Sequence, residues 1–256
     1  MKPESSSALV PSDQRDPVYQ ISTLQALVMG NFYGCLEVQD LLTHGNTGLG
    51  TFDAVDGELV VIDGHCYRIV KGGKAIEARP HDTTPFASVA FLDEETNDSL
   101  RFDALTSIDA LRHALDEYLE NRGPNNMYVM RVDGYFHFVA ARTELRQQEP
   151  FKPFAEVLQT DEDRFRFNSI HGTLVCFYFP KYLDGVNTPG WHFHFIDDAR
   201  KVGGHVFDLH LVSGRAIINK TDRFVLDLPH NRAFQEAALD QASKDEIRQI
   251  EQGAGD

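Results

Sequence analysis

The segment from Trp191 to His205 carries three histidines, His192, His194 and His205, whose spacing can form a metal site. In a β-strand successive side chains alternate between faces, so His192 and His194 project from one side with Cα atoms about 6–7 Å apart. Residues 197–204 are rich in turn formers, and strand-like sequence resumes after them, so a β-hairpin would bring His205 beside His194. Three neutral imidazoles without a fourth protein ligand are typical of a catalytic zinc site with an open position.

The interpretation as a metal site depends on which histidines belong to it and leaves the metal open. A His-x-His pair alone also occurs as ordinary strand histidines, and the third histidine is what favours a metal site. His210 lies an odd number of residues after His205, which places it on the opposite face of a regular strand, so we leave it out of the site. Imidazole is a ligand for Zn²⁺, Co²⁺ and Mn²⁺ alike, so the ligand type does not fix the metal.

The composition restricts the possible partners. The chain has 256 residues and a formal net charge of −15, which disfavours nucleic acids and anionic membranes as partners. Its cysteines, Cys35, Cys66 and Cys176, are widely spaced and indicate neither a disulfide framework nor a cysteine-ligated metal. Residues 1–17 read as a flexible polar tail whose only apolar run, 8–10, is too short for a signal peptide or membrane span. We therefore expect a cytoplasmic protein.

The elements before residue 144 are mostly strands. Residues 49–70 predict a meander with turns at the Asp-Gly pairs 56–57 and 63–64. A helix opens after a capping box with Ser22 at its N-cap, and a longer helix covers 107–119. Three further strands are predicted at the following positions: 85–91, 127–132 and, after the pair Asp133-Gly134, 135–141.

A second sheet-rich part follows a polar, proline-containing segment at residues 146–152. It contains a strand at 173–179, the histidine hairpin, and a C-terminal helix that opens with a capping box at 243–246. We predict an α/β fold of two sheet-rich mixed halves, 18–143 and 144–256, with the metal site on a β-hairpin of the second half.

Several separate segments, in this order, resemble one enzyme family. These are Leu24-Gln25-Ala26-Leu27, the stretch from Gly48 to Gly64, the histidine hairpin with Gly203-Gly204-His205, and Leu228-Pro229. In combination they are similar to bacterial α-acetolactate decarboxylase, from about residue 19 to the C-terminus. The resemblance implies a zinc-dependent homodimer of two mixed domains that needs no organic cofactor. The reaction that it implies converts (S)-2-acetolactate to (R)-acetoin and CO₂ in acetoin and butanediol metabolism.

The resemblance also implies the residues of the site. It places the metal ligands at His192, His194 and His205. The catalytic group would comprise Thr51, Glu58, Arg142 and a glutamate of the C-terminal tail, for which Glu251 is the best match because Glu246 already has a role as a helix-capping residue.

The chemistry of these side chains agrees with the implied reaction. Glu58 opens a run that is apolar on both faces, where burial disfavours the charged carboxylate and suits an acid, although a solvated glutamate after an Asp-Gly turn is the alternative. Arg142 ends the strand 135–141, from which it orients an anionic substrate or extends to solvent. Thr51 either donates a hydrogen bond to substrate or is a simple strand former.

Two other functions fit three histidines. A cupin-like dioxygenase or isomerase would use Fe²⁺ or Mn²⁺ with the same imidazoles. A non-catalytic metal-binding module would use zinc for stability or sequestration, and it predicts that Glu58 and Arg142 lie far from the metal. The distance between these two side chains and the histidines is therefore decisive.

Overall fold

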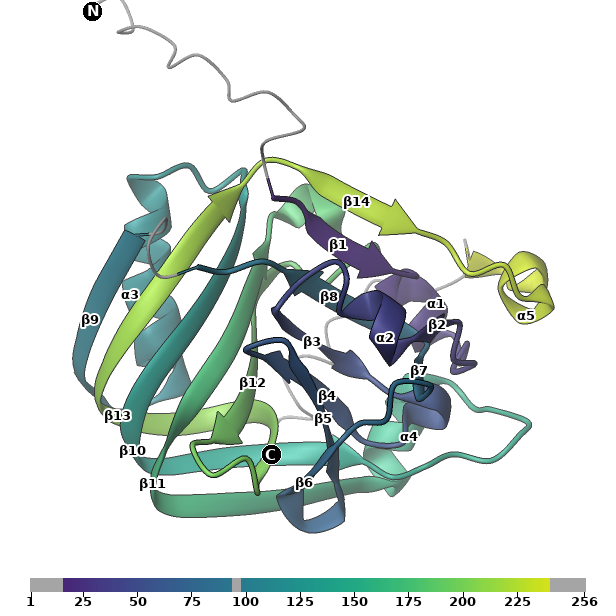
Figure 1. Ribbon diagram of the computed structural model, residues 1–256, viewed down its shortest axis with the longest axis horizontal. Coiled ribbons are helices and arrows are strands. Elements are labelled where there is room, and N and C mark those ends of the chain that lie inside the picture. The colour runs from purple at the N-terminus through teal and green to yellow at the C-terminus, as the bar shows by residue number, and fades with distance from the viewer. Residues whose placement is uncertain (1–15, 94–97, 240–256) are drawn as a thin grey trace, which may run out of the picture.

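The computed structural model describes residues 16–93 and 98–239, and it consists mainly of two β-sheets packed against each other (Figure 1). One sheet has seven strands and the other five. A small two-stranded pairing of β2 (Leu36–Glu37) and β7 (Thr83–Thr84) accompanies them. The fold is thus the predicted sheet-rich mixed α/β structure.

The seven-stranded sheet contains the predicted meander. The turn between β4 and β5 has Asp63 and Gly64 at φ 53° and 76°, as a tight hairpin requires. Only the pairing of β1 with β14 is parallel. In spatial order the strands are β14 (Phe224–Asp227), β1 (Val18–Ile21), β8 (Phe86–Ala90), β3 (Thr47–Thr51), β4 (Glu58–Ile62), β5 (His65–Val70) and β6 (Lys74–Glu77).

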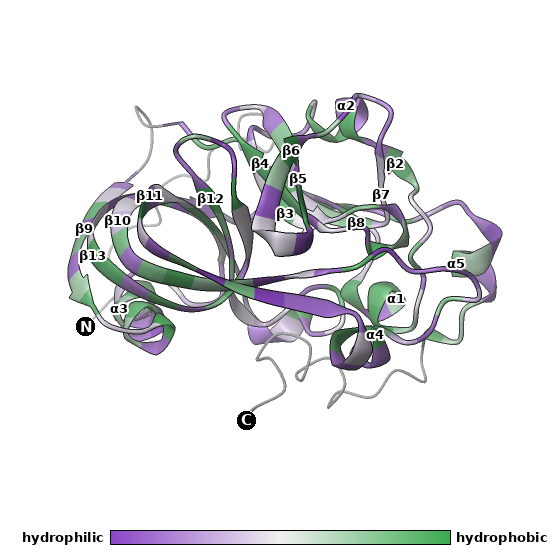
Figure 2. Cartoon of the chain, turned by 90° about the horizontal axis from the view of Figure 1, so that it is seen from below, coloured by the Kyte–Doolittle hydropathy of each residue, from purple (hydrophilic) through white to green (hydrophobic). Residues whose placement is uncertain are grey.

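The five-stranded sheet is built from long, curved strands. Its members are β9 (Asp98–Leu105), β10 (Met127–Glu144), β11 (Glu162–Phe179), β12 (Gly190–Asp197) and β13 (Gly203–Thr221). Strand β10 pairs with both β11 and β13, and β12 pairs with the same two strands, so these four close on themselves. Hydrophobic and hydrophilic stretches follow one another along these strands (Figure 2), and β12 and the second half of β11 are buried on both faces.

The helices are few and mostly short. The predicted helix at 107–119 is confirmed as α3, with the Ser107 side chain accepting a hydrogen bond from the backbone N–H of Ala110. The first cap was predicted one residue early, because Thr23 rather than Ser22 accepts from Ala26. The helices are α1 (Leu24–Val28), α2 (Val38–Leu41), α3 (Ile108–Glu120), α4 (Phe154–Thr160) and α5 (Arg232–Glu236), with 3₁₀ turns η2 (Asp53–Val55), η3 (Lys71–Gly73) and η4 (Lys181–Leu183). No helix in the described part of the chain is long and apolar enough to cross a membrane.

The predicted separation of strands 127–132 and 135–141 at Asp133-Gly134 is wrong, because β10 runs through this pair without a break. Gly134 pairs with Gly172 on one side and Gly214 on the other, which forms a row of glycines across three strands. A Cβ at Gly134 would lie 2.7 Å from the Ser213 carbonyl oxygen, so glycine here permits close approach of the backbones rather than a turn.

The sheets draw strands from both sides of the predicted boundary at residue 143. Strands β9 and β10 join the later strands, and β14 joins the earlier ones. The division into two separate domains stays a prediction, and residues 1–15 of the predicted tail lie outside the described residues, as does the predicted capping box at 243–246.

Strand β12 separates an apolar layer from the histidines. Trp191, Phe193 and Phe195 belong to a large core cluster with α3 and the inner faces of the long strands. The alternating residues His192 and His194 therefore face the opposite way, toward the seven-stranded sheet. The fold thus places the histidines between the two sheets.

Candidate metal centre and active site

The histidine hairpin is confirmed. Strand β12 carries His192 and His194, β13 carries His205, and the register pairs His194 directly with His205. The preceding glycines allow this approach, because a Cβ at Gly203 would lie 2.3 Å from the Phe195 carbonyl oxygen and Gly204 has φ 154°. The hairpin thus presents three imidazoles from two adjacent strands.

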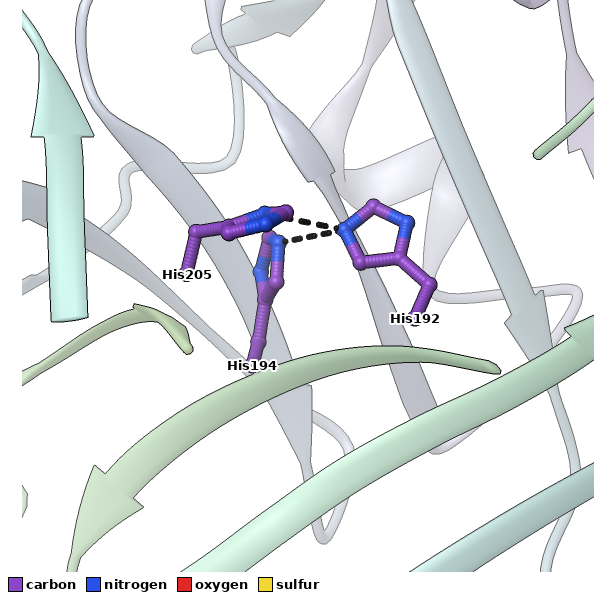
Figure 3. Close-up of side chains that lie close together, drawn as sticks. All are labelled: His192, His194 and His205. Atoms are coloured by element: carbon purple, nitrogen blue, oxygen red, sulfur yellow. Dashed lines mark hydrogen bonds between the residues drawn. The ribbon is translucent and has the colours of Figure 1, made fainter. Parts of the chain in front are cut away.

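The three imidazoles converge on one point (Figure 3). The Nε2 atom of His192 lies 3.2 Å from Nε2 of His194 and 3.1 Å from Nδ1 of His205. A tetrahedral zinc ion with bonds of about 2.0–2.1 Å would hold its ligand atoms roughly 3.3–3.4 Å apart. The buried triad therefore has the spacing of a metal site, and these three nitrogens can hold a metal ion.

A contact to the other sheet orients one of these rings. Nδ1 of His194 lies 2.9 Å from the backbone carbonyl oxygen of Leu59 on β4. Only a protonated Nδ1 can donate this hydrogen bond, which leaves the lone pair on Nε2 to face the other two histidines. This arrangement is the usual outer support of a metal-ligating histidine.

Burial keeps the triad uncharged. It lowers the pKa of His192 to about 3, with the Arg142 guanidinium as the next cause. The pKa of His194 is also well below its usual range, through burial and then His192, as is that of His205, through burial and then Arg142. Neutral nitrogens with lone pairs aimed at one another need a shared cation, and these rings do not take up protons readily. A metal ion meets that need.

We expect the metal-free protein to lose stability as pH falls from about 6.5 toward 3. Unfolded histidines take up protons near pH 6.5, whereas the folded triad does not, so the unfolded state binds more protons throughout that window. Above pH 7 this contribution is constant. Urea unfolding of chelator-treated protein at several pH values measures it, and a His192→Gln/His194→Gln/His205→Gln variant should show a smaller slope. Equal slopes for the two proteins would contradict the pKa directions.

Glu58 is buried beside the triad, as predicted. Its side chain is 7% exposed, with Oε2 3.4 Å from Nε2 of His194 and Oε1 3.8 Å from Nδ1 of His205. The backbone N–H of Glu58 donates to the Thr143 hydroxyl, which itself donates to the Ile69 carbonyl. A threonine of the five-stranded sheet thus holds the backbone of Glu58 in the seven-stranded sheet.

Arg142 also lies at the triad, although its predicted place at a strand end is wrong. It sits inside β10, which continues to Glu144, and it is 2% exposed. Its Nη1 donates to Glu162 at 2.9 Å, and Nη2 lies 3.5 Å from Nε2 of His205. Arg142 therefore supplies a fixed positive charge to the site.

Thr51 lines the same pocket, and its hydroxyl donates to the Gly57 carbonyl at 2.9 Å. That hydrogen bond fixes the residue before Glu58. His210 is outside the site, as predicted, with its ring against His137 and Phe138. Glu251 lies outside the described residues.

One pocket unites these groups. Its polar lining comprises Thr51, Glu58, Arg142, Glu144 and the three histidines, and its apolar wall comprises Leu24, Leu27, Phe86 and Phe154. Helices α1 and α4 supply most of that wall. The pocket combines a metal site, a cation and carboxyl groups with an apolar wall, which suits a small organic anion.

Three residues of this centre were missed by the sequence analysis: Thr143, Glu144 and Glu162. Thr143 and Glu144 follow a strand-like run and resemble the start of a polar connection. The regular alternation of β10 was the only available signal, since it places Glu144 on the same face as Arg142.

Comparison with known proteins gives a consistent result. Residues 18–241 match the model of the alpha-acetolactate decarboxylase family. The chain is 38% identical over 251 residues to the alpha-acetolactate decarboxylase of Methanosarcina mazei, covering 97% of this chain and 85% of that protein. It is 34% identical over 244 residues to that of Bacillus subtilis strain 168, covering 94% of each.

A solved structure extends this likeness to the fold. The crystal structure of alpha-acetolactate decarboxylase from Bacillus subtilis strain 168 has a TM-score of 0.87 at 33% identity, covering 92% of this chain and 99% of that chain. Sequence and structure thus agree over nearly the whole chain, and the protein belongs to the alpha-acetolactate decarboxylase family of enzymes.

Proposed function

We propose that this protein decarboxylates 2-acetolactate to acetoin and CO₂ in a reaction that depends on Zn²⁺ held by His192, His194 and His205. The observation that carries the proposal is the convergence of three buried imidazoles with Glu58 and Arg142 in one pocket, in a member of this family. A bound Zn²⁺ ion would supply Lewis acidity that favours electron density on the substrate oxygens.

The charge of Arg142 suits an anionic substrate. The guanidinium is buried, is held by Glu162, and faces the pocket beside His205. Charge-assisted hydrogen bonds from it would orient the substrate carboxylate before the reaction and the enediolate after CO₂ departs. Because the whole chain carries a net charge of −15, an anionic substrate needs such a local cation in the pocket.

Glu58 is the residue that we assign to proton transfer. Breaking the bond to CO₂ leaves an electron pair that delocalises into the neighbouring ketone, and the resulting enediolate must gain one proton at carbon to give acetoin. The Glu58 carboxyl group lines the pocket and is shielded from solvent. As a general acid it would return that proton, while Thr51 and Thr143 hold its strand in place.

The alternatives predict different observations. A non-catalytic module requires Glu58 and Arg142 to be remote from the histidines, whereas they lie 3.4 Å from His194 and 3.5 Å from His205. A cupin-like dioxygenase requires O₂ and a redox-active metal. Membership of the decarboxylase family disfavours that chemistry.

Incubating the purified protein with racemic 2-acetolactate tests the proposal. We expect acetoin and CO₂ to form in equal amounts, faster than the spontaneous reaction, with no uptake of O₂ and with half of the racemate consumed rapidly. A rate equal to the background in zinc-loaded protein would contradict it. The (R) configuration of acetoin, the homodimer, the cytoplasmic location and the role in butanediol metabolism stay predictions.

A further inference from the structure

The connection between Thr51 and Glu58 has a backbone conformation that its sequence does not favour. It contains Ala54 at φ 60° and Val55 at φ 46° in succession. Positive φ at two consecutive residues is what a type I′ turn requires, and Asn-Gly or Gly-Gly is the usual pair there. For a β-branched residue such as Val55 a positive φ is a genuine outlier. Such strain persists only where the surrounding structure imposes it.

Backbone hydrogen bonds hold the strained pair from two sides. The N–H of Ala54 donates to the carbonyl of Phe32, which lies beyond α1, at 2.8 Å. The backbone N–H of Gln147 donates to the Ala54 carbonyl at 2.9 Å. Gln147 lies shortly after β10, the strand of the other sheet that carries Arg142. The turn that precedes Glu58 is therefore tied to the chain segment that follows Arg142.

Val55 anchors the turn behind the wall of the pocket. Its side chain is fully buried and belongs to the same core cluster as Leu24, Leu27, Phe86 and Phe154. These four residues form the apolar wall of the pocket. A change in φ rotates Cβ about the N–Cα bond, so an ordinary negative φ would turn this side chain out of the cluster. The burial of the valine thus requires the strained backbone.

The strained turn ends on both sides at residues of the pocket. Thr51 is the last residue of β3, Glu58 is the first residue of β4, and the two pair directly. The turn therefore sets how far both side chains extend toward the histidines. This matters because a misplacement of about 1 Å can lower the rate of a reaction about 10²-fold.

We propose that Val55 is a positioning residue, whose buried side chain anchors the strained turn and thereby fixes Thr51 and Glu58 relative to Arg142. A glycine would satisfy the backbone at this position but would leave no side chain to hold the turn. The expected effect on turnover rests on the proposed function, whereas the expected effect on the order of residues 51–58 does not.

The Val55→Gly substitution removes the anchor while suiting the backbone. We expect kcat for 2-acetolactate to fall about tenfold with KM changed less, because Glu58 acts on the reacting group rather than on binding. The Tm should fall no further than in Val38→Ala, since relief of strain offsets part of the lost burial. Val38 is a buried valine of another core cluster and does not line the pocket, so its substitution should leave kcat unchanged.

The Ala54→Gly substitution separates the anchor from the strain. It eases the same turn but keeps the valine side chain, so we expect kcat within about threefold of wild type. A fall in kcat as large as that in Val55→Gly would show that backbone stiffness rather than the valine places Glu58, and it would overturn the proposal.

Hydrogen–deuterium exchange of residues 51–58 gives a readout that needs no turnover. We expect faster exchange of this segment in Val55→Gly than in wild type, and no change in Val38→Ala. Wild-type kcat or wild-type exchange in Val55→Gly would overturn the proposal. If wild type itself shows no turnover, the proposed function fails, and exchange in the same variants still decides the role of Val55.

Discussion

Replacing Glu58 with glutamine should lower kcat for acetolactate decarboxylation by about 10²–10⁴-fold, the usual contribution of a general acid. The variant should retain zinc, because the proposed ligands are the three histidine nitrogens, which lie within 4.8 Å of one another and are unchanged by the substitution. Glutamine fills the same space but has no acidic proton to return to the enediolate. Initial rates of acetoin formation, with metal content measured on the same samples, check this expectation.

The matched control for this substitution is Glu77→Gln. Glu77 is an exposed glutamate that pairs with His65 and does not line the pocket. The Glu77→Gln substitution should leave kcat unchanged. Full activity in zinc-loaded Glu58→Gln would remove Glu58 from proton transfer and would revive the non-catalytic module.

Replacing Arg142 with methionine should damage both stability and turnover. Removing one partner of a buried ion pair costs about 3–5 kcal/mol, and we expect the lower end because Glu162 keeps Arg164 as a second partner. For a chain of this size, about 3 kcal/mol corresponds to a fall in Tm of roughly 6–12 °C. Turnover should fall because the pocket loses its fixed positive charge for the substrate.

Arg166→Met is the comparison for this variant. Arg166 is an exposed arginine of β11 whose guanidinium lies 3.6 Å from the Phe138 ring centre, so its loss also removes an arginine contact. We expect little change in Tm or kcat from it. Differential scanning calorimetry of both variants tests the difference, and an Arg142→Met variant as stable and active as Arg166→Met would contradict the assigned role.

The metal ligands could be predicted from sequence because their geometry is local. His192 and His194 share a face through strand alternation alone, and turn-forming residues predict the hairpin that returns His205. Glu58 was implied as a site residue by the family resemblance, and the apolar run that it opens predicted only its burial, which the sheet confirms. The histidine ligands, in contrast, required only a few neighbouring residues.

The contacts between the sheets could not be predicted in this way. The Thr143 hydroxyl contacts the backbone of Glu58, which lies 85 positions earlier in the chain, and Glu144 lines the same pocket as Glu58. The Asp133-Gly134 pair also led to a wrong strand boundary, because the same two residue types form a tight turn at Asp63-Gly64. Only the neighbouring strands reveal that Gly134 instead permits close packing.

Removing and restoring the metal tests the central claim most directly. Acetoin formation is followed in protein treated with a chelator and then titrated with Zn²⁺. We predict that turnover falls to the spontaneous rate without metal and returns in proportion to zinc, reaching its maximum at one equivalent per chain. Undiminished turnover in metal-free protein, or none in protein with one bound zinc, would contradict a zinc-dependent decarboxylase at the histidine triad.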